Sequence, residues 1–115
     1  MKKIFILIIS IPILFSCNDI FEEDIENDTV NLIYPNNNSE ITNNDVNFTW
    51  SKLSGASNYR FQIFKSENNL LLKDTLINKN EIDIYLSNGI YSWRVRAENS
   101  GYSSLYSPNN FLKVN

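Results

Sequence analysis

The sequence is short of several residue types on which common functions depend: its 115 residues include no histidine and only one cysteine, and its net charge is −3. Histidine is the side chain that most often moves protons near neutral pH and the commonest metal ligand, so its absence argues against most enzymes and metal centres. One cysteine cannot form an internal disulfide or a thiolate zinc site. The acidic balance argues against nucleic acid, whose binding proteins carry a basic surface. We therefore expect one small domain without catalytic residues, metal or cofactor.

Residues 1–16 have the layout of an export signal. Lys2 and Lys3 give a positive start, and residues 4–15 form an apolar run that only Ser10 and Pro12 interrupt. The run is shorter than the roughly 20 residues that a membrane-spanning helix needs. A positive start, a short apolar stretch and a small residue before the cut are typical of a signal peptide.

The segment Leu-Phe-Ser-Cys at residues 14–17 resembles the lipobox of bacterial lipoproteins, in which the signal is cut before a cysteine that then carries the lipid. The resemblance implies an acylated Cys17 that ties the protein to a membrane of the cell envelope. Two or more acyl chains hold firmly, since each buried methylene contributes about 0.8 kcal/mol and one chain alone binds only marginally. The alternative is an ordinary secreted protein with a stray cysteine near the cut site.

Residues 17–29 are strongly acidic and contain no basic side chain. Such a block repels itself and has little to bury, which predicts a flexible, solvated tether. An acidic stretch just after the cysteine also resembles the surface-export signal of some Gram-negative lipoproteins, and this implies an outer-membrane protein that faces outward. A plain acidic spacer fits the composition equally well. The acidic residues are Asp19, Glu22, Glu23, Asp24, Glu26 and Asp28.

From Val30 onward, apolar and polar residues alternate in short runs separated by turn-forming residues, and asparagine, a turn former, occurs 19 times in the chain. Alternation is typical of strands with one buried face, and no helical period persists. We expect residues 30–115 to form an all-β sandwich of about seven antiparallel strands. Residues 111–114 interrupt the alternation, so we expect either a β-bulge in the last strand, which would restore the register, or a poorly defined edge. The runs are residues 30–34, 46–50, 59–63, 70–75, 82–86, 91–97 and 110–114.

Several motifs of this region resemble a fibronectin type III domain, a member of the immunoglobulin-like folds. Residues 86–97, Leu-Ser-Asn-Gly-Ile-Tyr-Ser-Trp-Arg-Val-Arg-Ala, resemble the turn and sixth strand of that family. Residues 48–50 and 59–63 resemble its second and third strands. The resemblance implies that Trp50 and Trp93 fill the core between two sheets. It also implies that Tyr91 is a tyrosine corner, whose hydroxyl bonds to nearby backbone.

Exposed aromatic side chains are the candidate ligand contacts. Tyr102 and Tyr106 flank the loop before the last strand, where members of that family often engage ligands. Phe64 and Tyr85 are also expected to face outward. Scattered surface aromatics are normal in any protein, so an unremarkable surface is the alternative.

Charged residues offer little for chemistry. A glycosidase needs two acids about 5–10 Å apart across a cleft, but a small sandwich offers no deep cleft, so Asp74, Glu81 and Asp83 are expected on a solvated face. Arg94 and Arg96 share one face of a strand, where they either meet an acidic partner or are simply solvated.

Two short strings resemble the Asp-Thr-aliphatic sequon for O-linked glycans in the same group of bacteria. They place candidate glycosylation sites at Thr29 and Thr75. A three-residue pattern also arises easily by chance.

The sequence therefore predicts an exported, lipid-anchored, non-catalytic envelope protein with one fibronectin type III-like module. Its expected partner, besides the membrane bound through Cys17, is an unknown envelope protein that it docks or joins. The alternative is capture of a polysaccharide by stacking on Tyr102 and Tyr106. A small hydrolase is a third and weaker possibility, since the chain has no histidine.

Overall fold

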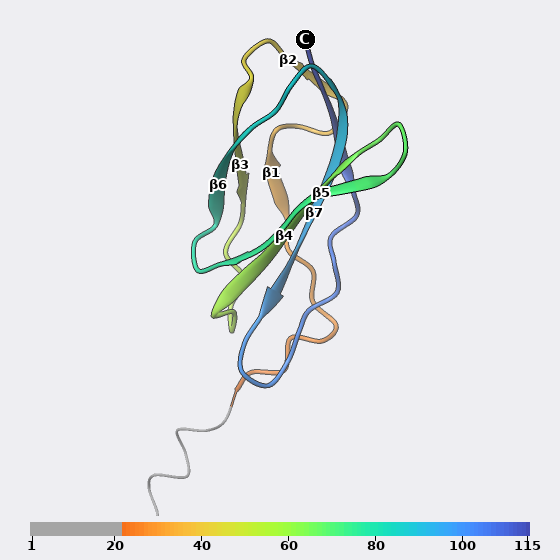
Figure 1. The fold of residues 1–115 in the computed structure, drawn as a ribbon. Coiled ribbons are helices and arrows are strands. Elements are labelled where there is room, and N and C mark those ends of the chain that lie inside the picture. Colours follow the sequence, from red (N-terminus) through yellow and green to blue (C-terminus); the bar gives the residue numbers. More distant parts are fainter. Residues whose placement is uncertain (1–21) are drawn as a thin grey trace, which may run out of the picture.

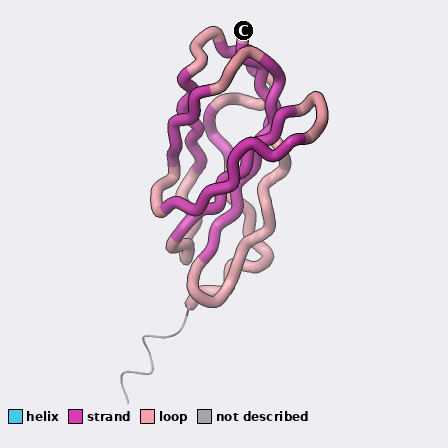
Figure 2. Tube along the Cα trace, in the orientation of Figure 1, coloured by secondary structure: helices cyan, strands magenta, loops and turns pink. Residues whose placement is uncertain are grey.

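The computed structural model describes residues 22–115, so the predictions for the export signal and for Cys17 lie outside the described residues. The described part contains strands and no helix, and hence no helix long and apolar enough to cross a membrane (Figure 2). The strands are β1 (Leu32–Tyr34), β2 (Ser39–Ile41), β3 (Asp45–Trp50), β4 (Asn58–Lys65), β5 (Leu70–Ile77), β6 (Glu81–Tyr85), β7 (Gly89–Glu98) and β8 (Asn110–Val114).

The strands form two sheets that face each other (Figure 1). One sheet has the order β1-β3-β6 and the other the order β2-β8-β7-β4-β5. All neighbours are antiparallel except β2 and β8, which are parallel. The predicted all-β sandwich is confirmed, with one strand pair that departs from the expected antiparallel arrangement.

The alternating runs correspond to seven of the strands, and β2 is the strand that the sequence did not predict. Its three residues are too few to show a period, and its pairing partner β8 lies about 70 residues further along the chain.

The predicted bulge in the last strand is wrong. Leu112 and Val114 are buried, while Phe111 and Lys113 are exposed, and the register between β7 and β8 is unbroken. The prediction failed because it took residues 111–114 as a break in the alternation, whereas the apolar Phe111 faces solvent and burial alternates regularly along the strand. An irregularity in the same sheet falls instead between Ile63 and Phe64 in the β4–β5 pair.

Aromatic rings fill the space between the sheets. Phe48 and Trp50 from β3 meet Phe61 from β4 and Trp93 from β7, and all four are fully buried. The Phe48 ring lies edge-on to Phe61 and Trp93 at centroid distances of 5.1 and 5.0 Å. Edge-on contacts of this kind add to the gain from burying the ring area. One aromatic cluster therefore joins the two sheets at the centre of the core.

Tyr91 fixes the turn between β6 and β7. Its side chain is 2% exposed, and its hydroxyl donates to the Ser87 carbonyl at 2.6 Å. This is the hydrogen bond expected of a tyrosine corner, because it ties the start of β7 to the backbone just before it.

The start of the described chain differs from the predicted tether. Ile25 is fully buried within the core cluster, and the Asp28 carbonyl accepts a hydrogen bond from the Leu105 amide at 3.0 Å. The packed domain therefore begins no later than Ile25, and the boundary predicted at Val30 is wrong. Composition misled the prediction, because the acidic neighbours face solvent while one aliphatic side chain enters the core.

Asn99 and Gly55 hold this segment against the end of the domain. The Asn99 side-chain amide donates to the carbonyls of Glu23 and Gly55 at 2.8 and 3.0 Å. Gly55 has φ +90°, and a Cβ there would lie 2.9 Å from the Cβ of Glu23. The close approach therefore requires glycine at this position.

Candidate functional site

The outer face of the five-stranded sheet carries an apolar row where strand alternation calls for polar side chains. Leu71, Phe64, Ser92 and Phe111 lie side by side across β5, β4, β7 and β8. Leu71 and Phe111 are 44% and 42% exposed, and Ile90, two residues before Ser92 on the same face, is 52% exposed. We call Leu71, Phe64, Phe111 and Ile90 the apolar row.

Sequence reasoning missed most of this row. It took Phe64 as exposed but read Phe111 as a sign of irregularity and gave Leu71 and Ile90 no role. The sequence could have shown that Ile90 faces outward. Alternate residues of a strand point to opposite sides, and Tyr91 and Trp93 face inward. Only the register of four strands shows that the exposed apolar residues are neighbours.

Arg94 lies beside the apolar row and is fixed by three side chains. Its guanidinium carbon is 3.9 Å from the ring centroid of Tyr106 and 5.5 Å from that of Phe64. Its Nε donates to Oε1 of Gln62 at 2.8 Å. Stacking on aromatic rings stabilises a guanidinium. Among the described residues its two terminal nitrogens form no hydrogen bond, so they are free to meet an acceptor on a partner.

A network of ion pairs extends the charged part of this face. Glu98 Oε2 accepts hydrogen bonds from Arg96 Nε at 2.9 Å and from Arg60 Nε at 3.2 Å, and Arg60 Nη1 lies 3.0 Å from Asp74 Oδ1. The hydrogen bond from Arg60 holds the pKa of Asp74 below its ordinary value, and the same bond raises the pKa of Arg60. Arg60, Arg94 and Arg96, here the basic cluster, outnumber their two carboxylate partners in a chain of net charge −3.

The predicted ligand contacts Tyr102 and Tyr106 do not form a shared exposed surface. Tyr102 is half-buried against the core. Tyr106 is also half-buried, with Arg94 and Arg96 over its ring at 3.9 and 4.8 Å. A sugar ring needs an open aromatic face on which to stack, and the arginines occupy that of Tyr106.

The two candidate glycosylation sites differ in access. Thr29 is exposed, whereas Thr75 is half-buried and pairs with the fully buried Phe61 on the inner side of the sheet. A bulky glycan therefore fits the surroundings of Thr29 better than those of Thr75.

The outer face of the three-stranded sheet is acidic. Glu81, Asp83 and Tyr85 alternate outward along β6, and Tyr85 is 71% exposed. The side-chain amide of Asn47 on β3 donates to Glu81 Oε1 at 3.1 Å and to Asp83 Oδ1 at 2.7 Å. We call Glu81, Asp83 and Tyr85 the acidic strip. Asp74 lies on the other sheet beside Arg60, so the three carboxylates considered for glycoside hydrolysis do not meet.

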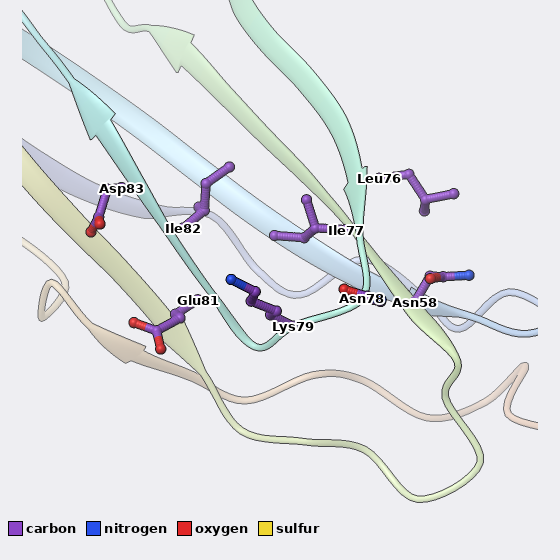
Figure 3. A pocket seen from close by; sticks show the side chains of 8 residues that line it. All are labelled: Asn58, Leu76, Ile77, Asn78, Lys79, Glu81, Ile82 and Asp83. Carbon is purple, nitrogen blue, oxygen red and sulfur yellow. The ribbon is translucent and has the colours of Figure 1, made fainter.

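A hollow of about 710 Å³ lies between the edges of the two sheets (Figure 3). It exists because β5 and β6 are edge strands of different sheets and do not pair. Figure 3 shows Ile77 and Ile82 beside the space between these strands, and Glu81 and Asp83 on the far side of β6. Its lining contains no serine, threonine or cysteine, so it presents no hydroxyl or thiol nucleophile. Within residues 22–115, no three Cys, Asp or Glu side chains gather to hold a metal ion.

Comparison with known proteins identifies the fold but no family. No protein-family model and no curated protein matches the sequence. The structure is similar to the FN1–FN3 domains of chicken CNTN1, with TM-score 0.61 and 13% identity over 79% of this chain and 35% of that one. It is also similar to the fibronectin(III)-like modules of Clostridium thermocellum CbhA, with TM-score 0.54 and 17% identity over 74% of this chain and 93% of that one.

The chain therefore has the fold of a fibronectin type III domain, an immunoglobulin-like β-sandwich. It spans about a third of the chicken CNTN1 structure and most of the CbhA structure. The fibronectin type III resemblance of the sequence is confirmed at the level of the fold.

Proposed function

We propose that the protein is a non-catalytic, exported interaction module, held in the cell envelope by an acylated Cys17, that binds another protein through the outer face of its five-stranded sheet. The observation that carries the proposal is the apolar row lying beside an immobilised Arg94. Exposed apolar patches on a soluble domain mark contact surfaces. Protein interfaces are enriched in aromatic side chains and arginine, which dominate their binding energy.

The anchor and the envelope location rest on the sequence. A short apolar run that ends in Leu-Phe-Ser-Cys supports cleavage before Cys17, and the acidic residues that follow support export to the outer surface. Metabolic labelling with an alkyne-tagged palmitate tests the anchor. We expect the wild-type protein to be labelled and Cys17→Ser to be unlabelled. Labelling of Cys17→Ser, or an unlabelled wild type, contradicts the anchor.

The contact face is tested by photo-crosslinking in producing cells. A photoreactive phenylalanine analogue placed at position 111 keeps the phenyl ring of the native residue. The matched control places the same analogue at Leu105, which is 55% exposed in the β7–β8 connection. We expect a protein adduct from position 111 and none from position 105. Absence of an adduct from position 111, or equal adducts from both positions, contradicts the proposed face.

Protein binding has better support than the sugar-binding alternative. Stacking on Tyr102 and Tyr106 would need two open rings, and both are half-buried. O-glycosylation of the chain itself stays a separate proposal, with Thr29 the better exposed site. The intact mass of the native protein, compared with that of Thr29→Ala, tests it.

A further inference from the structure

We propose that the partner of this face is a second copy of the chain, whose acidic strip lies against the basic cluster and the apolar row. The inference rests on the proposed function, because it names the partner of that same face. The two surfaces lie on opposite sides of one sandwich, since the acidic strip belongs to the three-stranded sheet and the basic cluster to the five-stranded sheet. One copy can therefore offer each surface to a different neighbour.

The charges on the two surfaces have the same spacing. Glu81 and Asp83 are two residues apart on β6, and Arg96 and Arg94 are two residues apart on β7. Residues two apart on a strand face the same way and lie roughly 6.6–6.8 Å from each other. Asp83 of one copy can thus meet Arg94 of the next while Glu81 meets Arg96.

Arg94 and Asp83, which this arrangement pairs, can both form further hydrogen bonds. The terminal nitrogens of Arg94 have no acceptor among the described residues. Among the same residues Asp83 accepts from the Asn47 amide and pairs with no cation. An arginine held by stacking can bind a carboxylate through two parallel hydrogen bonds, which gives strength and orientation together.

The residues that follow these charges along the two surfaces are also complementary. Beyond Asp83, the acidic strip presents Tyr85, which is 71% exposed. Beyond Arg94, Ser92 is buried between Phe64 and Phe111, so these two rings form the opposite surface at this level. The Tyr85 ring of the neighbouring copy can pack against Phe111 and Phe64. Burial of a ring of this size removes about 150–250 Å² from water.

This alignment gives neighbouring copies the same orientation relative to the membrane. Tyr85 and Ser92 both lie toward the β6–β7 turn, and Glu81 and Arg96 lie toward the other end of the domain (Figure 1). Pairing like end with like end leaves residue 22 of every copy on the same side. Copies anchored at Cys17 in one membrane must share that orientation. Because the two contacting surfaces differ, the contact is heterologous and extends as an open row.

Anchoring in one membrane would also allow copies of the protein to associate through a weak contact. Confinement to a membrane raises the effective concentration of neighbours, so an interaction that is weak in dilute solution can be occupied at the surface. The test therefore uses the full chain in producing cells. Its readout is the identity of the protein that becomes attached to the photoreactive analogue at position 111.

Charge reversal makes the test specific. Asp83→Arg removes the acidic partner from every copy, and Arg94→Asp removes the basic one. We expect each reversal alone to lower the yield of the self-adduct roughly tenfold or more, because like charges then face each other. When the two variants are produced together, with the analogue only in the Asp83→Arg chain, the adduct with the Arg94→Asp chain should return. Glu67→Arg, at an exposed position in the β4–β5 turn, should leave the self-adduct unchanged.

The outcomes separate this inference from the proposed function. A self-adduct that both reversals abolish and the mixture restores supports the row of copies. A self-adduct that Asp83→Arg leaves intact overturns the inference, and so does an adduct with a different protein. In those two cases the proposed contact face stands. No adduct of any kind from position 111 contradicts both. Unchanged thermal unfolding of each variant shows that the charge change has not unfolded the domain.

Discussion

At the scale of single residues, the tryptophans combine tight packing with an unmet hydrogen bond. Trp50 and Trp93 are fully buried, and among the described residues neither indole N–H has an acceptor. A buried donor without an acceptor costs free energy. The stabilisation by these side chains therefore comes from the burial and packing of their rings and not from a hydrogen bond of the indole.

Two substitutions at Trp93 separate these effects. Trp93→Ala should lower the free energy of unfolding by about 3–5 kcal/mol, because it leaves a cavity among the aromatic rings. Typical stabilities are about 5–15 kcal/mol, so this change can unfold the domain. Trp93→Phe should cost much less, since it keeps most of the ring area and removes the unmet donor. Chemical denaturation measures both, and equal losses would contradict the packing account.

The ion pair of Arg60 with Asp74 predicts a dependence on pH. The pKa of Asp74 is lowered in the folded state, so its contribution to stability is present above the unfolded pKa of about 3.9 and is lost as pH falls through the folded value. The difference in unfolding free energy between wild type and Asp74→Asn should therefore be largest near pH 7 and vanish in strong acid. Added salt should reduce it.

Asp45→Asn is the matched control for this measurement. Asp45 is exposed on the other sheet, and its carboxylate forms no ion pair among the described residues. A pH dependence that Asp45→Asn alters as much as Asp74→Asn does would contradict the assignment to the ion pair.

At the scale of elements, β5 is an edge strand with an unusual number of exposed leucines. It pairs only with β4, and Leu70, Leu71, Leu72 and Leu76 are 51%, 44%, 44% and 44% exposed. A long apolar edge invites pairing with another chain. Two features oppose this: the register breaks opposite Ile63 and Phe64, and Lys73 pairs with the buried Ile63 and so faces inward. A bulge and an inward charge are common protections of an edge.

The protective role of Lys73 can be tested directly. Lys73→Val should leave the melting temperature nearly unchanged but increase aggregation during prolonged incubation, because it removes the charge from the apolar edge. Light scattering follows the aggregation. Lys79→Val, just beyond the end of β5, is the control and should aggregate no faster than wild type. Equal behaviour of the two variants would contradict this role.

The segment before β1 behaves as part of the domain. Ile25→Ala should lower the free energy of unfolding by about 2–5 kcal/mol, because Ile25 is fully buried. Glu26→Gln, next to it and exposed, should change stability little. Chemical denaturation of the two variants checks this. If Ile25→Ala leaves the free energy of unfolding unchanged, the predicted flexible tether is the better description of this segment.

Sequence periodicity predicted the elements whose burial alternates over many residues. The core positions Trp50 and Trp93 and the turn held by Tyr91 followed from alternation together with the resemblance. The burial of Ile25 did not, because one apolar residue among acidic ones has no period. The apolar row did not either, since Phe111 and Leu71 lie 40 residues apart and become neighbours only through the registers of three strand pairs.

At the scale of the whole molecule, the chain enters the domain at the end opposite to its C-terminus (Figure 1). Four residues lie between Cys17 and residue 22, so the Cα atoms of these two residues are at most about 18 Å apart. If Cys17 carries the anchor, the domain is therefore held close to the membrane with its long axis away from it. Its two outer sheet faces then point sideways, toward neighbouring molecules.

The central claim is that a neighbouring molecule covers the outer face of the five-stranded sheet when the protein is in the cell envelope. Hydroxyl-radical footprinting of Phe111 tests this most directly, with Leu105 as the exposed reference, because both residues are open to solvent in the isolated domain. We predict that Phe111 is labelled in the purified protein and protected in intact producing cells, while Leu105 is labelled equally in both. Equal labelling of Phe111 in the two states would contradict the account.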